Sequence, residues 1–167
     1  MKTRTSYSWT QQTPWGTLGI SATVDGVHAV RLQATGGSRT LDASAPQVVR
    51  QIATRFEKFF AGDVKELDHV AVDLSSVSND FQRKVLATLR KRVGPGKTIS
   101  YGELAEVVGH PGAARAVGTA MARNPVPIIV PCHRVLASGG RLGGYGGGLD
   151  MKRGLLELER AGERLIR

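Results

Sequence analysis

The chain contains a single cysteine, Cys132, and the two residues after it, His133 and Arg134, can take part in proton transfer or stabilise negative charge. The nucleophilic form of cysteine is the thiolate, which needs a nearby base or positive charge to form near neutral pH. We predict that His133 is this base. Because neighbours in the sequence point in different directions on a strand or a helix, we expect a water molecule to link the two side chains.

The segment before Cys132 indicates a rigid and water-poor approach to the sulfur. Residues 124–131 (NPVPIIVP) contain three prolines, which restrict the backbone, with apolar residues between them. A lone cysteine in an arbitrary protein is more often a small core residue than a nucleophile. We favour the nucleophile here because charged residues such as His133 and Arg134 rarely enter a core.

A third group should hold the imidazole of His133 in the required tautomer, and a carboxylate usually has this role. The sequence predicts a final amphipathic helix over residues 153–161, capped by Asp150. This part of the chain offers three candidate carboxylates: Glu157, Glu159 and Glu163.

The number and spacing of the cysteines and histidines argue against disulfide bonds and metal sites. One cysteine can form neither an internal disulfide nor a cysteine-rich zinc site. The other histidines, His28, His69 and His110, lack the spacing of metal ligands. We therefore expect no metal site.

The elements that position these residues begin with a hairpin. Residues 17–24 and 27–32 have the composition of strands, and the Asp25-Gly26 dipeptide between them is a strong turn signal. A helix is expected over residues 46–62, with its apolar side chains on one face. Together with the apolar run of residues 70–74, these elements predict a small α+β unit.

The C-terminal half is predicted to be mostly helical. A helix should follow the cap residue Asn79, and two more are expected over residues 101–108 and 113–123. A glycine-containing turn separates the last two, which is helix-turn-helix spacing. We place the domain boundary in the polar stretch before Asn79, so that the predicted domains are residues 1–77 and 78–167.

The balance of charge favours a polyanionic partner. The chain has 23 Lys and Arg against 14 Asp and Glu, a formal net charge of +9, which suits a nucleic acid or an acidic membrane surface. No signal-peptide pattern follows the N-terminus, and no segment reaches the ~20 apolar residues that span a bilayer. We expect a soluble, intracellular protein.

The predicted helix over residues 113–123 has two distinct stripes. Residues 113, 117, 120 and 121 form a packing stripe, and the other stripe carries small residues and one arginine: Ala114, Arg115, Gly118 and Ala122. Small residues allow close approach to another surface, and an isolated arginine could insert into a base stack or groove. Helix–helix packing with a solvated arginine explains the same spacing equally well.

The glycine-rich loop of residues 138–148 has two interpretations. Its backbone N–H groups could face an oxygen or a phosphate of a ligand. It lacks the lysine and hydroxyl residue of a P-loop, so a flexible hairpin is an equal alternative.

The segment of residues 124–135 (NPVPIIVPCHRV) resembles the active-site signature of O6-alkylguanine-DNA alkyltransferases, the methylated-DNA–protein-cysteine methyltransferases. The similarity covers about residues 81–159 and includes four further stretches: residues 99–101, 113–118, 144–149 and 155–159. The N-terminal half matches this family only loosely.

The resemblance implies a fold and a function. The expected fold is α+β, with an N-terminal ribonuclease-H-like domain followed by a mostly helical, winged-helix-like DNA-binding domain. The expected activity is DNA repair by a monomeric, cytoplasmic and nucleoid-associated protein that flips the damaged nucleotide out through the minor groove of double-stranded DNA. The alkyl group of O6-alkylguanine would pass irreversibly to Cys132, with O4-alkylthymine as a possible second substrate. Each molecule would act once, and no cofactor is needed.

The resemblance also implies roles for particular residues. His133 would act on Cys132 through water, Glu159 would orient His133, and Tyr101 would assist proton transfer to the departing base. Asn124 would brace the turn before Cys132. The DNA-binding helix face would comprise Arg115, which fills the space of the flipped nucleotide, with Ala114, Ala116, Gly118 and Ala122. The base pocket would comprise Val135, Tyr145, Gly146 and Pro127.

One position departs from the family pattern, and two rival functions remain open. Gly146 stands where many members have serine, so a hydroxyl contact to the base is absent while backbone contacts remain possible. An alkyltransferase-like protein binds damaged bases without reacting, but such proteins lack the cysteine. A cysteine-dependent hydrolase would use Cys132 and His133 for acyl transfer with many turnovers.

Overall fold

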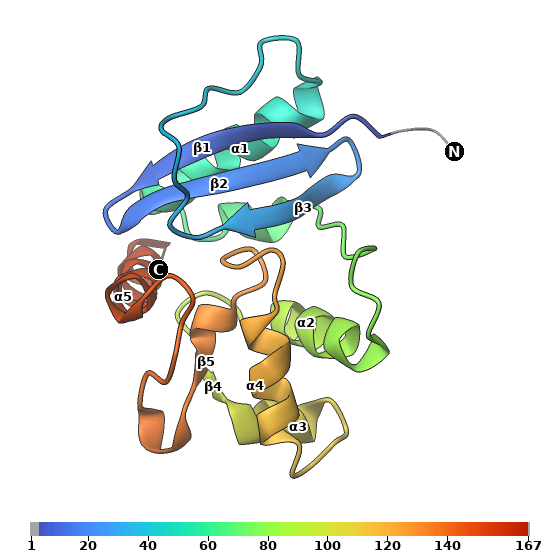
Figure 1. The fold of residues 1–167 in the computed structure, drawn as a ribbon. Coiled ribbons are helices and arrows are strands. Elements are labelled where there is room, and N and C mark those ends of the chain that lie inside the picture. Colours follow the sequence, from blue (N-terminus) through green and yellow to red (C-terminus); the bar gives the residue numbers. More distant parts are fainter. Residues whose placement is uncertain (1–3, 167) are drawn as a thin grey trace.

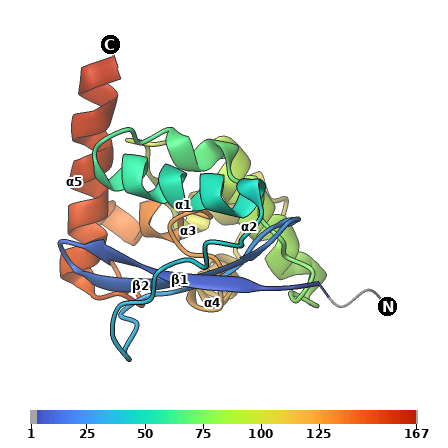
Figure 2. The same cartoon turned by 90° about the horizontal axis from the view of Figure 1, so that it is seen from above.

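The computed structural model describes residues 4–166, and the side chains of residues 4–163. The N-terminal part is an antiparallel sheet in the order β1-β2-β3, formed by Tyr7–Thr13, Gly16–Thr23 and Gly26–Arg31. Helix α1 (Gln47–Phe60) lies along one face of this sheet, as Figures 1 and 2 show, and its buried apolar side chains belong to the hydrophobic core. The predicted hairpin and helix are both confirmed, although the two turn residues are Val24 and Asp25, and Gly26 is the first residue of β3.

Two features of this unit differ from the expectations. Strand β1 was not predicted, because its sequence YSWTQQT is largely polar and only Trp9 is buried in the core. Residues 70–74 do not form a regular strand. They contribute a single bridge, Val27 to Val72, held by hydrogen bonds from Val27 N to Ala71 O (2.9 Å) and from Asp73 N to Val27 O (2.8 Å).

The C-terminal part is helical, as predicted (Figure 1). Helix α2 (Asp80–Arg92) begins at the cap Asn79, whose side chain accepts a hydrogen bond from Gln82 N. Helices α3 (Tyr101–Val107) and α4 (Ala114–Ala122) pack together with helix-turn-helix spacing. Ser100 and Glu103 form a reciprocal capping box that fixes where α3 begins.

A short parallel pair of strands connects α3 to the predicted reactive segment. In this pair, β4 (Ile99–Ser100) runs beside β5 (Val135–Leu136). A 3₁₀ turn, η2 (Cys132–Arg134), comes directly before β5. Tyr101 is the residue after β4, so this pairing brings the start of α3 beside Cys132.

The last helix, α5 (Leu149–Ile166), joins the two parts of the molecule and is longer than predicted. Asp150 lies inside its first turn and pairs with Arg153 (3.3 Å), so the prediction that Asp150 is the cap is wrong. A side chain at Gly154 would overlap the indole of Trp15, so glycine is what allows α5 to approach the turn between β1 and β2.

The core forms one hydrophobic cluster that runs from the sheet and α1 through α2 to α5. The α+β class is confirmed, and the division between residues 77 and 78 stays a prediction because packing is continuous across it. None of the helices in residues 4–166 is both long and apolar enough to cross a membrane.

Candidate active site

The turn before Cys132 is held in an unusual backbone conformation by one side chain. Ile128 has φ = 75°, a left-handed conformation that is costly for a β-branched residue. Asn124 spans the turn, because its Nδ2 donates to Val130 O (2.9 Å) and its Oδ1 accepts from Val126 N (3.0 Å). This geometry fits the bracing role expected of Asn124.

Cys132 lies at the end of this turn and lines a pocket of about 390 Å³. Its side chain is almost fully covered, with 8% exposed. Most residues that were predicted for the base pocket line this cavity, together with residues from the small-residue face of α4. The full lining is Leu32, Tyr101, Gly118, Met121, Ala122, Asn124, Pro127, Cys132, Gly144, Tyr145 and Gly146.

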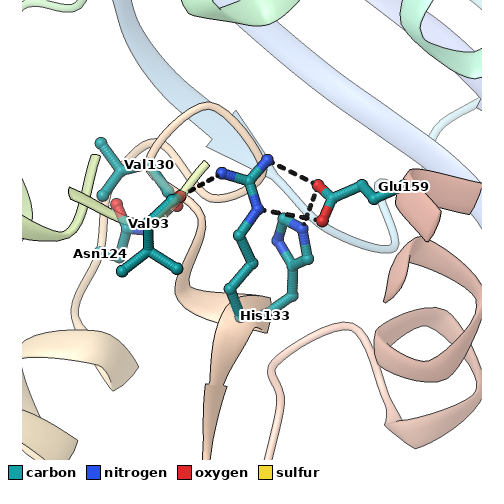
Figure 3. A network of polar contacts seen from close by, with 6 residues as sticks. Val93, Asn124, Val130, His133 and Glu159 are labelled. Atoms are coloured by element: carbon teal, nitrogen blue, oxygen red, sulfur yellow. Dashed lines mark hydrogen bonds and ion pairs between the residues drawn. The ribbon is translucent and has the colours of Figure 1, made fainter. Parts of the chain in front are cut away.

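The side chains of His133, Arg134 and Glu159 form a buried polar network (Figure 3). His133 Nε2 donates to Glu159 Oε1 (2.7 Å), and Arg134 donates to both carboxylate oxygens (Nε–Oε2 3.0 Å, Nη2–Oε1 2.7 Å). The third guanidinium nitrogen, Nη1, donates to Val93 O (2.6 Å) at the end of α2. Of the three carboxylates left open by the sequence, the structure therefore brings Glu159 to His133.

The charge of Glu159 is strongly stabilised. Burial opposes its ionisation, but the charges and hydrogen bonds of His133 and Arg134 outweigh this effect and lower the pKa of Glu159 to about 2. An ionised carboxylate only accepts hydrogen bonds, so Nε2 of His133 must carry the proton. In neutral His133 the other nitrogen, Nδ1, is then free to accept one.

The Nδ1 atom of His133 is buried and has no hydrogen-bond partner among the described residues. Buried polar atoms are nearly always paired, by protein or by ordered water. Among the described residues, no direct hydrogen bond joins the side chains of Cys132 and His133, and both observations agree with the expected water link.

One premise of the sequence analysis is wrong. We expected His133 and Arg134 to lie outside the core, yet their side chains are 0% and 4% exposed. Burial is possible because Glu159, 26 and 25 residues away, accepts hydrogen bonds from both side chains and balances the charge of Arg134. Cys132 is thus a buried cysteine that directly precedes two members of a buried polar network in the sequence.

The electrostatic surroundings affect Cys132 and Tyr101 in related ways. Burial raises the pKa of the Cys132 thiol, while the side chain of Asn124 and the charge of Lys152 lower it. Burial and the negative charge of a Cys132 thiolate both raise the pKa of Tyr101. The phenol of Tyr101 therefore stays protonated near neutral pH and can donate a proton within the pocket.

Tyr145 closes the pocket on the other side. Its ring lies edge-on to His133, with ring centres 6.4 Å apart, and its hydroxyl is buried without a partner among the described residues. Burial is the main reason that the pKa of Tyr145 lies well above its ordinary value. A Cβ atom on neighbouring Gly146 would meet only Leu32, at 3.8 Å, so the missing serine is not a steric requirement of this chain.

Helix α4 presents its two stripes as predicted. Val117, Ala120 and Met121 are buried, whereas Arg115, Ala116 and Ala122 are exposed. Gly118 is half-buried beside the ring of Tyr101, where an added Cβ would lie 3.9 Å from the ring. Ala114 is also half-buried. The exposed part of this face borders the mouth of the Cys132 pocket.

The residues of the site that were not foreseen include Lys152 and Leu32, and also Met121 and Gly144 of the pocket lining. Lys152 is fully buried in α5, and Leu32 reaches the pocket from the end of the N-terminal sheet. Lys152 precedes Glu159 by two helical turns and shares its face, so the periodicity of α5 carried a signal for it. Nothing in the local sequence pointed to Leu32. Among the described residues, no three His, Cys, Asp or Glu side chains group to hold a metal ion.

Comparison with known proteins agrees with this geometry. The family described as the DNA-binding domain of 6-O-methylguanine DNA methyltransferase matches residues 80–161. The methylated-DNA–protein-cysteine methyltransferase of Mycolicibacterium paratuberculosis is 46% identical over 123 residues, which cover 74% of this chain and 72% of the relative. The human protein of the same name is 38% identical over 93% of this chain and 80% of its own length.

Solved structures give the same result over almost the whole chain. The O6-methylguanine methyltransferase of Mycobacterium tuberculosis superimposes with a TM-score of 0.78 at 36% identity, covering 98% of this chain and 100% of that one. A structure of the same organism's protein in complex with DNA gives a TM-score of 0.76 at 41% identity, with 92% of each chain covered. This chain therefore belongs to the methylated-DNA–protein-cysteine methyltransferase family.

Proposed function

We propose that this protein repairs alkylated DNA by transferring the alkyl group from O6 of guanine to the sulfur of Cys132. The observation that carries this proposal is the position of Cys132, on the floor of a pocket beside an exposed, small-residue face of α4. The pocket volume of about 390 Å³ lies in the range of sites that enclose a small organic group. The family assignment supports DNA alkyl transfer as the reaction.

The polar network supports a route for the thiol proton. In this route a water molecule takes the proton of Cys132 and passes one to Nδ1 of His133. The resulting imidazolium is stabilised by the ionised carboxylate of Glu159, which is 2.7 Å from Nε2. The sulfur lone pair then forms a bond to the alkyl carbon, the bond between that carbon and O6 breaks, and the guanine leaves with the electron pair.

Tyr101 is suited to protonate the departing guanine, because it lines the pocket and its raised pKa keeps a proton on the phenol near neutral pH. We predict that Tyr101→Phe slows alkyl transfer roughly 10²-fold, a typical contribution of a general acid, while binding to alkylated DNA is kept. Single-turnover transfer rates and DNA-binding titrations measure the two effects. Tyr7→Phe, on β1 outside the pocket, is the matched control, and equal rates in both variants would refute the role.

Double-stranded DNA is the partner, and α4 is the part of the chain best suited to approach it. Alanine and glycine leave the helix backbone accessible, and Arg115 is exposed on the same face. The net charge of +9 also favours a polyanion. We propose that one protein molecule binds the DNA with α4 in the minor groove, and that Arg115 fills the space left by the flipped nucleotide.

Arg115→Ala should weaken repair of duplex DNA far more than reaction with free O6-alkylguanine, because a free base needs no flipping. We expect a loss of roughly tenfold to hundredfold on the duplex, as unstacking costs a few kcal/mol. Arg50→Ala, which removes an exposed charge from α1 instead, should leave both rates near wild type. Equal losses of Arg115→Ala on both substrates would contradict the finger role.

Stoichiometry separates this function from its rivals. A duplex with one O6-methylguanine is incubated in excess over the protein, and restored guanine is counted. We expect the reaction to stop at about one repaired base per molecule, because water does not readily displace a thiolate from an alkyl carbon. Continued turnover would indicate a hydrolase, and binding without any restoration would indicate a non-reacting damage-binding protein.

A further inference from the structure

Lys152 is an unusual residue of the site, because it is a lysine whose side chain has 0% exposure. Its ammonium group donates to three backbone carbonyls: Val135 O (2.8 Å), Leu142 O and Gly144 O (3.3 Å). An ammonium has three N–H donors, so these bonds use all of them. One carbonyl belongs to the strand directly after Cys132–Arg134, and the other two belong to the glycine-rich loop beside the pocket.

The charge of Lys152 has no acidic partner within the described part of the chain. No carboxylate there lies within ion-pair distance of its Nζ. On the same helix, Glu159 is already bound by His133 and Arg134, and Asp150 is exposed and pairs with Arg153. A buried cation without an anionic partner is costly, since neutral carbonyls replace only part of its hydration.

The group that can balance this charge is the sulfur of Cys132. The titratable side chains around the pocket are Cys132 from η2, His133 beside it, Tyr101 from α3 and Tyr145 from the loop. Of these groups, Cys132 is the one whose charge affects Lys152: burial lowers the pKa of Lys152, and a thiolate at Cys132 raises it. The same attraction lowers the pKa of Cys132, whereas burial raises it.

Building on the proposed function, we propose that Lys152 is a positioning residue whose buried ammonium group supplies the positive charge that favours the thiolate of Cys132. The three carbonyls hold the ammonium in place and do not neutralise it. Attack by Cys132 consumes the thiolate and leaves a neutral thioether, so Lys152 acts before the bond to carbon forms. Lys152 touches neither the base nor the alkyl carbon in this scheme.

The test is the pH dependence of Cys132 reactivity in three variants of the full chain. Iodoacetamide reacts with the thiolate of the single cysteine, so the midpoint of its rate against pH reports the pKa of Cys132. We expect Lys152→Met to raise this midpoint by about one pH unit or more, and Lys152→Arg, which keeps the charge, to stay within a few tenths of wild type. Arg153→Met, on the exposed face of α5, should match wild type.

A merely structural role of Lys152 predicts a different result. Loss of packing alone would lower the rate by the same factor at every pH and leave the midpoint where it is. An unchanged midpoint in Lys152→Met would therefore overturn the proposal, as would a midpoint in Lys152→Arg raised as far as in Lys152→Met.

A reciprocal measurement does not depend on the folding of Lys152→Met. Coupling between two charges is mutual, so removal of the thiolate must lower the pKa of Lys152. NMR titration of the Lys152 side chain in wild type and in Cys132→Ser should show this decrease, of about one unit. Identical titrations in the two proteins would overturn the proposal.

A failure of the proposed role of Lys152 can be distinguished from a failure of the proposed function. Iodoacetamide reactivity and the NMR titration need no DNA and no alkylated base. If wild type does not repair O6-methylguanine but the midpoints shift as expected, the coupling of Lys152 to Cys132 stands and the DNA function falls. If repair is stoichiometric and the midpoints do not shift, only the role of Lys152 falls.

Discussion

Replacement of Cys132 with serine should abolish alkyl transfer, leaving at most roughly 10⁻⁴ of the wild-type single-turnover rate. A hydroxyl is a far weaker acid than a thiol, so the route through His133 that can generate a thiolate cannot generate an alkoxide in useful amount. The two atoms are similar in size, and Asn124 offers a partner for a hydroxyl at this place. The fold and the pocket should therefore remain.

The control for Cys132→Ser is binding. The variant keeps the small face of α4 and the residues that line the pocket, so it should bind a duplex with O6-methylguanine about as tightly as wild type. Loss of transfer with binding retained assigns Cys132 to the chemical step. A variant that still transfers the methyl group would show that another atom is the acceptor.

The second large effect concerns Glu159→Gln, which should destabilise the protein by about 3–5 kcal/mol. Glutamine keeps the size of the side chain but removes the negative charge that Arg134 and His133 contact in the core. Arg134 is then a buried cation without its counter-charge. Denaturant unfolding measures this loss, and Glu157→Gln, exposed on the same helix, should be neutral within about 0.5 kcal/mol.

The same carboxylate predicts how stability depends on pH. The pKa of Glu159 is lowered to about 2 in the folded protein from an ordinary 4.5, so its stabilising effect is complete above about pH 4.5 and is lost as the pH falls toward 2. The difference amounts to about 3 kcal/mol. Wild type should lose this stability between pH 4.5 and 2, and Glu159→Gln should lack that component. Parallel pH profiles of the two proteins would contradict the buried ion network.

The sequence was most informative where the evidence is local. Helical spacing, the cap at Asn79 and the turn at Asp25-Gly26 predicted most elements, because periodicity and turn chemistry act within a few residues. Strand β1 was missed because it carries no such local signal. Most of its side chains are polar, and it forms a strand through its pairing with β2.

The site was harder to predict because its charges are balanced over long distances in sequence. The residues alone left three carboxylates open as the partner of His133, and only the resemblance to a family singled out Glu159. The rule that charged residues avoid the core failed for Arg134, whose partner lies 25 residues away. Lys152 was missed because the last helix was predicted to begin at residue 153, one residue too late to include it, and because its carbonyl partners leave no mark on the composition of the sequence.

The most direct test of the central claim is to locate the transferred group. Wild-type protein is incubated with a duplex that contains O6-methylguanine, digested, and analysed by mass spectrometry of its peptides. The account predicts one methyl group per molecule, carried by the peptide that contains Cys132 and assigned by fragmentation to its sulfur, with guanine restored in the DNA. An unmodified Cys132 after the guanine is restored, or a methyl group on any other residue, would contradict it.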